Sequence, residues 1–151
     1  MPEILYEDNH IIIVNKQCGD IVQGDKTGDK TLADDVKEYI KNKYAKDGNV
    51  YLGITHRLDR PTSGVVIFAR TSKALGRLNK MFSEHEIKKT YLAIVDKIPP
   101  EKEGNLTHFL IRNRKQNKSY AHNIEKKGSK KAELIYNFVA SSDKYFFRRN
   151  Y

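Results

Sequence analysis

The chain has 151 residues, of which 38% are hydrophobic and 31% are charged, and this composition is typical of one globular domain with a real core. No run of about 18 apolar residues is present, which argues against a membrane-spanning helix, and the first residues lack the basic and apolar segments of a secretory signal. The single cysteine, Cys18, excludes an internal disulfide and leaves no cysteine pair for zinc. We therefore expect a cytoplasmic protein.

The net charge of +9 is unevenly distributed along the chain. Residues 1–50 hold seven Lys/Arg and ten Asp/Glu, a net charge of −3, whereas residues 51–151 hold 21 and nine, a net charge of +12. This excess favours a polyanionic partner, most often nucleic acid, although a basic surface that only aids solubility is the alternative. No basic amphipathic helix with large apolar anchors is evident, so a membrane surface is not expected as a partner.

The first third of the chain predicts a hairpin followed by a helix. Two apolar segments, 4–6 and 11–14, flank a polar turn, which is typical of a β-hairpin. A helix is predicted to begin near Thr31 and to stop at 47–49. Its spacing of i, i+4, i+7 and i+8 gives one apolar face, made of Leu32, Val36, Tyr39 and Ile40.

The rest of the chain predicts mainly strands. Residues 65–69 form a continuous apolar run, as expected for a strand covered on both faces, and Thr71 or Ser72 can cap a second helix. Residues 88–95 predict a strand in which alternate side chains face opposite ways. Further strands are expected at 105–112, 119–124, 131–140 and 144–148, joined by basic connections at 112–118 and 126–131. Because the helices do not strictly alternate with the strands, the predicted fold class is α+β, a mixed and largely antiparallel sheet with a few flanking helices.

The segment His56-Arg57-Leu58-Asp59-Arg60-Pro61-Thr62-Ser63-Gly64 directly precedes the apolar run 65–69. Charges beside a buried strand are costly unless they are paired or used. Asp59 therefore has two interpretations. It bonds turn amides and pairs with Arg57 or Arg60, or it is a fixed, ionised carboxylate that acts as a nucleophile or a base.

Other candidate groups also have a structural and a chemical interpretation. His56 is either a structural histidine beside a strand or a general base. Tyr91 is either a core aromatic or a ring that stacks on a base and handles its proton. The five histidines show no metal-ligand spacing, and no glycine-rich phosphate loop is present.

Three segments together resemble the RluA-type RNA pseudouridine synthases. The first is His56–Asp59 followed by Thr62-Ser63-Gly64, the apolar strand and Arg70; the others are residues 4–16 and 89–95. They occur in the family's order and at suitable distances, over residues 4 to about 96. The resemblance implies a pseudouridine synthase-like catalytic domain.

The resemblance further implies an enzyme that converts uridine to pseudouridine in structured RNA, either rRNA or tRNA, without metal or cofactor. Asp59 would be the catalytic carboxylate, which attacks the ribose or the base or removes a ribose proton, on a uridine flipped out of the RNA. Tyr91 would stack on the target base, and Arg57 would help hold the vacated position in the RNA or its phosphates. The residues predicted to contact RNA are Arg60, Arg70, Lys73, Arg77, Lys89, Arg112, Arg114 and Lys115.

The resemblance also implies that residues 1–151 are a partial catalytic domain without a separate N-terminal RNA-binding domain. The family carries a third motif, Thr-Gly-Arg followed by His-Gln-Ile-Arg, whose arginine pairs with the catalytic aspartate, and this chain stops before it. We expect a monomer with weak or no activity alone. The alternative is a non-catalytic RNA-binding module or an inactive fragment of such an enzyme.

Overall fold

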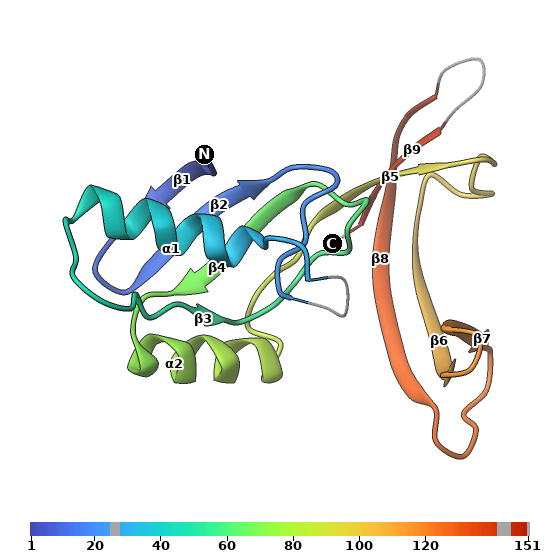
Figure 1. Ribbon diagram of the computed structural model, residues 1–151. Helices are drawn as coiled ribbons and strands as arrows, with labels where there is room; N and C mark the ends of the chain where they lie inside the picture. The colour runs from blue at the N-terminus through green and yellow to red at the C-terminus, as the bar shows by residue number, and fades with distance from the viewer. Residues whose placement is uncertain (25–27, 142–145, 151) are drawn as a thin grey trace. The chain divides into compact units, whose positions relative to one another are not determined.

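The computed structural model describes residues 1–24, 28–141 and 146–150, the last of these as backbone (Figure 1). The described chain divides into two compact units, Met1–Ile87 and Lys88–Tyr151, each with its own sheet. Whether they make up the single domain expected from the sequence stays a prediction.

The first unit is built on a four-stranded antiparallel sheet that buries one face. Its strands lie in the order β1 (Glu3–Glu7), β2 (Ile11–Lys16), β4 (Gly64–Ala69) and β3 (Gly53–Ile54). In β2 half-buried and fully buried side chains alternate, so every second residue faces the core. Ile12 and Val14 of β2 pair with Phe68 and Val66 of β4, and all four side chains are fully buried. This face is the centre of the hydrophobic core.

Helix α1 (Leu32–Lys43) covers the buried face of the first sheet. Its predicted start is confirmed, because the Asp34 amide donates to Thr31 Oγ1 and the Thr31 amide donates back to the Asp34 carboxylate, a capping box. The predicted end at 47–49 is wrong by four residues. The Tyr44 amide still donates to the Ile40 carbonyl, but Ala45 takes a positive φ, and the Lys46 amide donates back to the Lys41 carbonyl, which closes the end of the helix.

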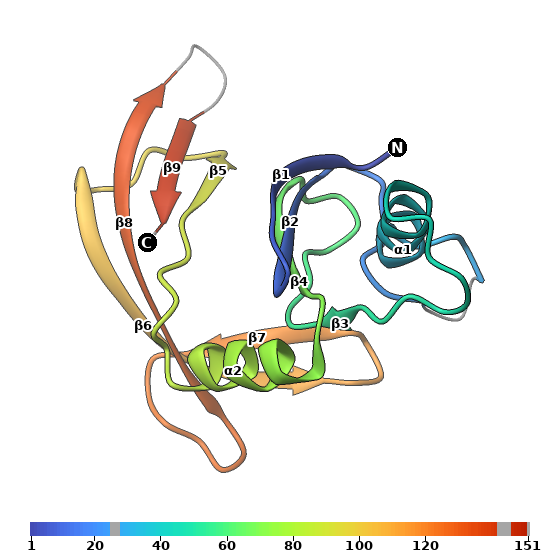
Figure 2. The same cartoon turned by 90° about the vertical axis from the view of Figure 1, so that its left-hand side faces the viewer.

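Helix α2 (Ser72–Ser83) packs on the opposite face of this sheet, as Figure 2 shows. Thr71 caps it, since Thr71 Oγ1 accepts the Ala74 amide at 3.1 Å. Leu75 lies so close to Gly53 that a Cβ there would meet its methyl groups at 3.0 Å. The prediction that 65–69 is covered on both faces is wrong at Val65, which is 53% exposed. Helix α2 packs near the other end of β4, since Leu75 lies against Gly53, which pairs with the buried Ala69.

The second unit is a five-stranded antiparallel sheet. Its strands lie in the order β5 (Tyr91–Val95), β9 (Phe146–Asn150), β8 (Lys130–Ser141), β6 (Glu103–Asn113) and β7 (Lys118–His122). Long strands β6 and β8 lie side by side in Figure 1. All four predicted strands after Val95 are present with shifted ends; of the predicted strand 144–148, residues 144 and 145 lie outside the described residues. Two helices with antiparallel sheets confirm the predicted α+β class. Every described strand pairing is antiparallel, so no parallel pair was found that would make either sheet mixed.

In β5, β6, β7 and β8, the strands of the second sheet whose side chains are described, few side chains are buried. Tyr136 is buried against Gly104, where a Cβ would lie 2.9 Å from the ring. In β5 the predicted alternation is confirmed: Ala93 and Val95 are half-buried, whereas Leu92 and Ile94 are exposed. Neither α1 nor α2, at 12 residues each, has the length and apolar character of a membrane span.

Candidate active site

Asp59 lies on a turn in the loop that joins β3 to β4 in the first unit. The Thr62 amide donates to the Asp59 carbonyl at 3.0 Å and closes this turn. The Asp59 side chain is exposed. Among residues 1–24 and 28–141, no side chain or amide forms a hydrogen bond or ion pair with the Asp59 carboxylate. The predicted pairing with Arg57 or Arg60 is therefore not observed in this part of the chain. The carboxylate is therefore accessible to a ligand.

Lys16 anchors the Asp59 turn from within the fold. Its side chain has no exposed surface, and its ammonium donates to the carbonyl oxygens of Gln17 at 3.1 Å, Arg60 at 3.2 Å and Thr62 at 2.6 Å. Three carbonyl acceptors offset the cost of burying a cation. Since two of them belong to the turn, Lys16 fixes the backbone that carries Asp59.

The sequence reasoning missed Lys16, although a signal was present. In β2 the buried positions are Ile12, Val14 and Lys16, every second residue. A lysine at an inward position of a strand must find polar partners inside the protein. The alternation of buried positions along β2, and not a motif, would have identified Lys16.

Arg60 secures the turn from the other side. The Gly19 amide donates to the Arg60 carbonyl at 2.8 Å, and Arg60 Nε donates back to the Gly19 carbonyl at 3.1 Å. The Arg60 guanidinium also lies 3.4 Å from an Asp29 carboxylate oxygen. Gly19 has φ +97°, which favours glycine. Arg60, predicted to contact RNA, thus already has partners within the protein.

His56 ties the loop to the middle of β4. Its Nε2 accepts the Ile67 amide at 3.1 Å, and its ring contacts the Phe82 ring with centroids 4.9 Å apart. Because Nε2 accepts a backbone hydrogen bond, that nitrogen is unprotonated and already used. The contacts support the structural interpretation of His56 over the general base.

Arg70 is held in a network around Glu7. Its guanidinium, 10% exposed, donates to the Glu7 carboxylate at 3.0 Å and to the Asp8 carbonyl, and it stacks on the Tyr44 ring at 4.8 Å. Burial alone raises the pKa of Glu7, but hydrogen bonds from Lys43, Tyr44 and Tyr39 outweigh it and hold the pKa below its ordinary value. A guanidinium used in this way is a poor ligand for RNA phosphates.

The remaining predicted cations of the first unit are exposed. Arg57 lies in the loop two residues before Asp59, and Lys73 and Arg77 lie on α2. None of these three side chains forms an ion pair with residues 1–24 or 28–141. They are free to meet an anionic ligand.

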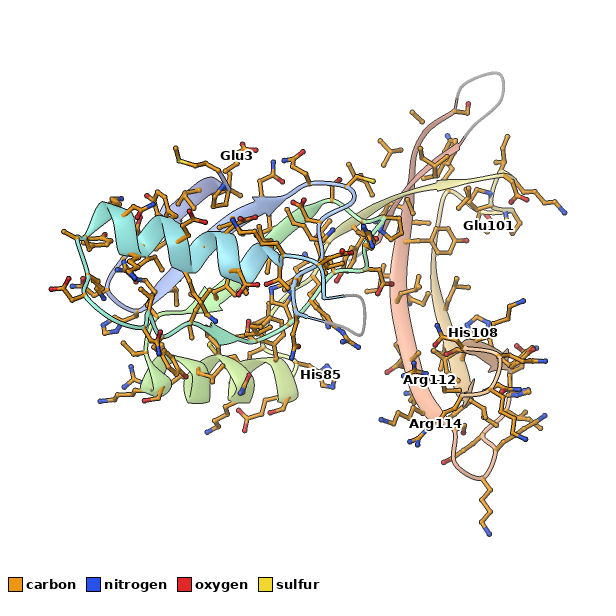
Figure 3. The ribbon with its side chains drawn as sticks, viewed as in Figure 1. Glu3, His85, Glu101, His108, Arg112 and Arg114 are labelled. Carbon is orange, nitrogen blue, oxygen red and sulfur yellow. The ribbon has the colours of Figure 1, made fainter. Side chains whose placement is uncertain are left out.

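The predicted residues of the second unit lie at opposite edges of its sheet. Tyr91 begins the edge strand β5 and is 44% exposed, so it is not a core aromatic, and Lys89 precedes it. Arg112, Arg114 and Lys115 gather at the β6–β7 hairpin beside the other edge, where Figure 3 shows the two arginines. Arg112 donates to Asn117 Oδ1 at 3.0 Å.

The described side chains do not form a metal-binding site. In that part of the chain no group of three or more His, Cys, Asp or Glu side chains could hold a metal ion. The independence from metal and cofactor implied by the resemblance stays a prediction.

Comparison with known proteins covers nearly the whole chain. A family model described as RNA pseudouridylate synthase matches residues 10–149. A ribosomal large subunit pseudouridine synthase C of Buchnera aphidicola is 36% identical over 125 residues, which are 83% of this chain and 38% of that protein. A tRNA pseudouridine synthase C of Vibrio cholerae is 38% identical over 95 residues, which are 63% of this chain and 37% of that protein.

The fold also matches a solved structure. Human RNA pseudouridylate synthase domain containing 4 aligns with a TM-score of 0.80 and 19% identity, over 98% of this chain and 57% of that chain. The chain spans about two fifths of the length of the curated relatives described above. The matched family model spans most of the chain, so this protein belongs to the RNA pseudouridylate synthase family.

Proposed function

We propose that this protein isomerises specific uridines to pseudouridine in structured RNA, with Asp59 as the catalytic carboxylate. Family membership supports the reaction. Relatives named as ribosomal and as tRNA synthases support either rRNA or tRNA as the substrate. The structural observation that carries the proposal is the Asp59 turn, where a buried ammonium fixes the backbone and the carboxylate faces outward.

In the proposed reaction the bond between ribose C1′ and uracil N1 breaks, the uracil rotates, and C1′ bonds to C5. The proton on C5 leaves, and N1 takes a proton, so substrate and product have the same atoms. Asp59 attacks the ribose or the base, or removes a ribose proton. A carboxylate suits these roles only if it is ionised and held in position.

The proposed supporting residues differ in how available their side chains are. Arg57 lies in the same loop as Asp59 and is exposed, and Tyr91 offers an exposed ring. Both fit a role in holding the RNA and its target base. The cations that we keep as proposed RNA contacts are those for which the described residues provide no acidic partner: Lys73, Arg77, Lys89, Arg112, Arg114 and Lys115.

The proposal is tested by tritium release from RNA that carries tritium on uridine C5, with the chain in excess over RNA so that slow turnover is detected. The unmodified chain should release tritium, and Asp59→Asn should lower release to background while RNA affinity stays the same. If the unmodified chain binds RNA but releases no more tritium than Asp59→Asn, the chain is a non-catalytic RNA-binding module or an inactive fragment of such an enzyme.

We further propose that the protein works as a monomer in the cytoplasm. The exposed lone Cys18 supports a reducing compartment, because it has no cysteine partner in the chain. Sedimentation at several concentrations checks the monomer.

A further inference from the structure

Aromatic side chains gather on one face of the β6–β7 hairpin. In the pairing of these strands Phe109 lies opposite His122, and Ile111 lies opposite Tyr120. Directly opposed residues of antiparallel strands project to the same side of the sheet. These four side chains, here called the aromatic face, therefore form one patch of two adjacent strands.

The aromatic face is open to a ligand. The Tyr120 side chain is 47% exposed, and Phe109 and His122 are half-buried. The Tyr120 hydroxyl donates to Gln116 Oε1 at 2.6 Å, which fixes the ring over the hairpin. A ring held in one orientation loses little conformational entropy when a planar group stacks on it.

The segment that carries this face is rich in positive charge. Residues 109–131 contain eight Lys/Arg and one acidic residue, Glu125. Lys118 lies two residues before Tyr120 on the same strand and projects to the same side of the sheet. Lys131 lies opposite Phe109, although its ammonium is paired with Glu133 at 2.8 Å.

We propose that the aromatic face binds unpaired nucleotides of RNA, with a base stacked on Tyr120 and the phosphates held by Lys118. Aromatic rings on an exposed sheet, with cations around them, recognise single-stranded nucleic acid because every base has a π-face. A second copy of the chain is disfavoured as the occupant, because it would bring the same positive segment against this one. None of the four residues belongs to the proposed catalytic set.

The experiment measures binding of a fluorescein-labelled single-stranded RNA of about eight nucleotides to the full chain by anisotropy. Tyr120→Val removes the ring and keeps a residue that favours strands, and it should weaken binding about tenfold. Tyr120→Phe keeps the ring but loses the hydroxyl that bonds to Gln116, and it should weaken binding much less than Tyr120→Val. Circular dichroism checks that each variant is folded.

Two further measurements separate stacking from charge and from chemistry. Lys118→Ala should lower the slope of log affinity against log salt by about 0.7, whereas Tyr120→Val should leave the slope unchanged. Asp59→Asn should not change this binding, so the experiment tests the RNA-binding proposal independently of the proposed reaction. Equal RNA affinity of Tyr120→Val and the unmodified chain would overturn the proposal. A change in the sedimentation of Tyr120→Val without a change in RNA affinity would also overturn it, because the face would then bind a second copy of the chain.

Discussion

The two units of the chain bury their side chains in different ways. The largest fully buried side chains of the described residues all lie in the first unit, where α1 packs on the sheet through Val36 and Ile40. The described part of the second unit buries Tyr136 but leaves Leu92 and Ile94 exposed. The first unit therefore has the packing to hold a loop in one position, whereas the described side chains of the second unit mainly form surface.

The largest expected difference between the units is in stability. Phe68→Ala removes a fully buried ring from the core of the first unit and should lower the free energy of unfolding by about 4 kcal/mol. Leu92→Ala, at a side chain that is 73% exposed, should change it by less than about 0.5 kcal/mol. Urea unfolding followed by circular dichroism measures both; similar losses would mean that Leu92 is buried in solution.

A smaller but more specific loss is expected at the Asp59 turn. Lys16→Met removes the buried ammonium and leaves three carbonyl oxygens without their donor, which should cost about 2–3 kcal/mol. The matched control is Lys37→Met on the exposed side of α1, which should cost less than about 0.5 kcal/mol. Equal unfolding midpoints for these two variants would contradict the anchoring role of Lys16.

The pH dependence of stability should also distinguish the units. Because hydrogen bonds lower the pKa of Glu7 below its ordinary 4.5, the stability it contributes is complete above that value and is lost as pH falls through the lowered pKa. Glu7→Gln should therefore flatten the loss of stability between about pH 6 and about pH 3.

The control in the second unit is Glu133, whose pKa is lowered by a hydrogen bond from Lys131. That pair is exposed to solvent, so Glu133→Gln should leave the pH dependence nearly unchanged. Urea midpoints measured across this pH range test both variants. An equal flattening by the two substitutions would show that burial of Glu7 makes no difference.

The smallest effects are expected from exposed cations on RNA affinity. Replacing Lys73 and Arg77 by alanine, or Arg114 and Lys115, should each lower the slope of log affinity against log salt by about 1.4 without changing stability. Replacing Lys37 and Lys41 of α1 serves as the control, with no change expected. Unchanged slopes for the first two pairs would remove them from the proposed RNA contacts.

Local pattern was enough to predict most elements and the helix starts. Thr31 and Thr71 cap α1 and α2 as expected, because a cap depends on residues three positions away. The hairpin of β1 and β2 and the alternation in β5 depend equally on near neighbours. The end of α1 was missed because Ala45 takes a positive φ there, which is uncommon for a residue other than glycine.

The candidate site was predictable only in part. The loop with Asp59 was identified from its charges and its resemblance to a family. The anchoring by Lys16 joins residues more than forty positions apart, and the pairing of Arg70 with Glu7 spans a still greater separation. Nothing in a local pattern shows such partners, so neither the anchoring by Lys16 nor the pairing of Arg70 with Glu7 was predicted.

The substitution Asp59→Glu keeps the charge and moves the carboxylate by one methylene group, so it tests whether the anchored turn positions this carboxylate for the reaction. Its tritium release from C5-labelled RNA should fall at least about a hundredfold, with stability and RNA affinity unchanged, because a fixed turn cannot correct the position. Release close to that of the unmodified chain would contradict the claim that the anchored backbone positions this carboxylate for the reaction.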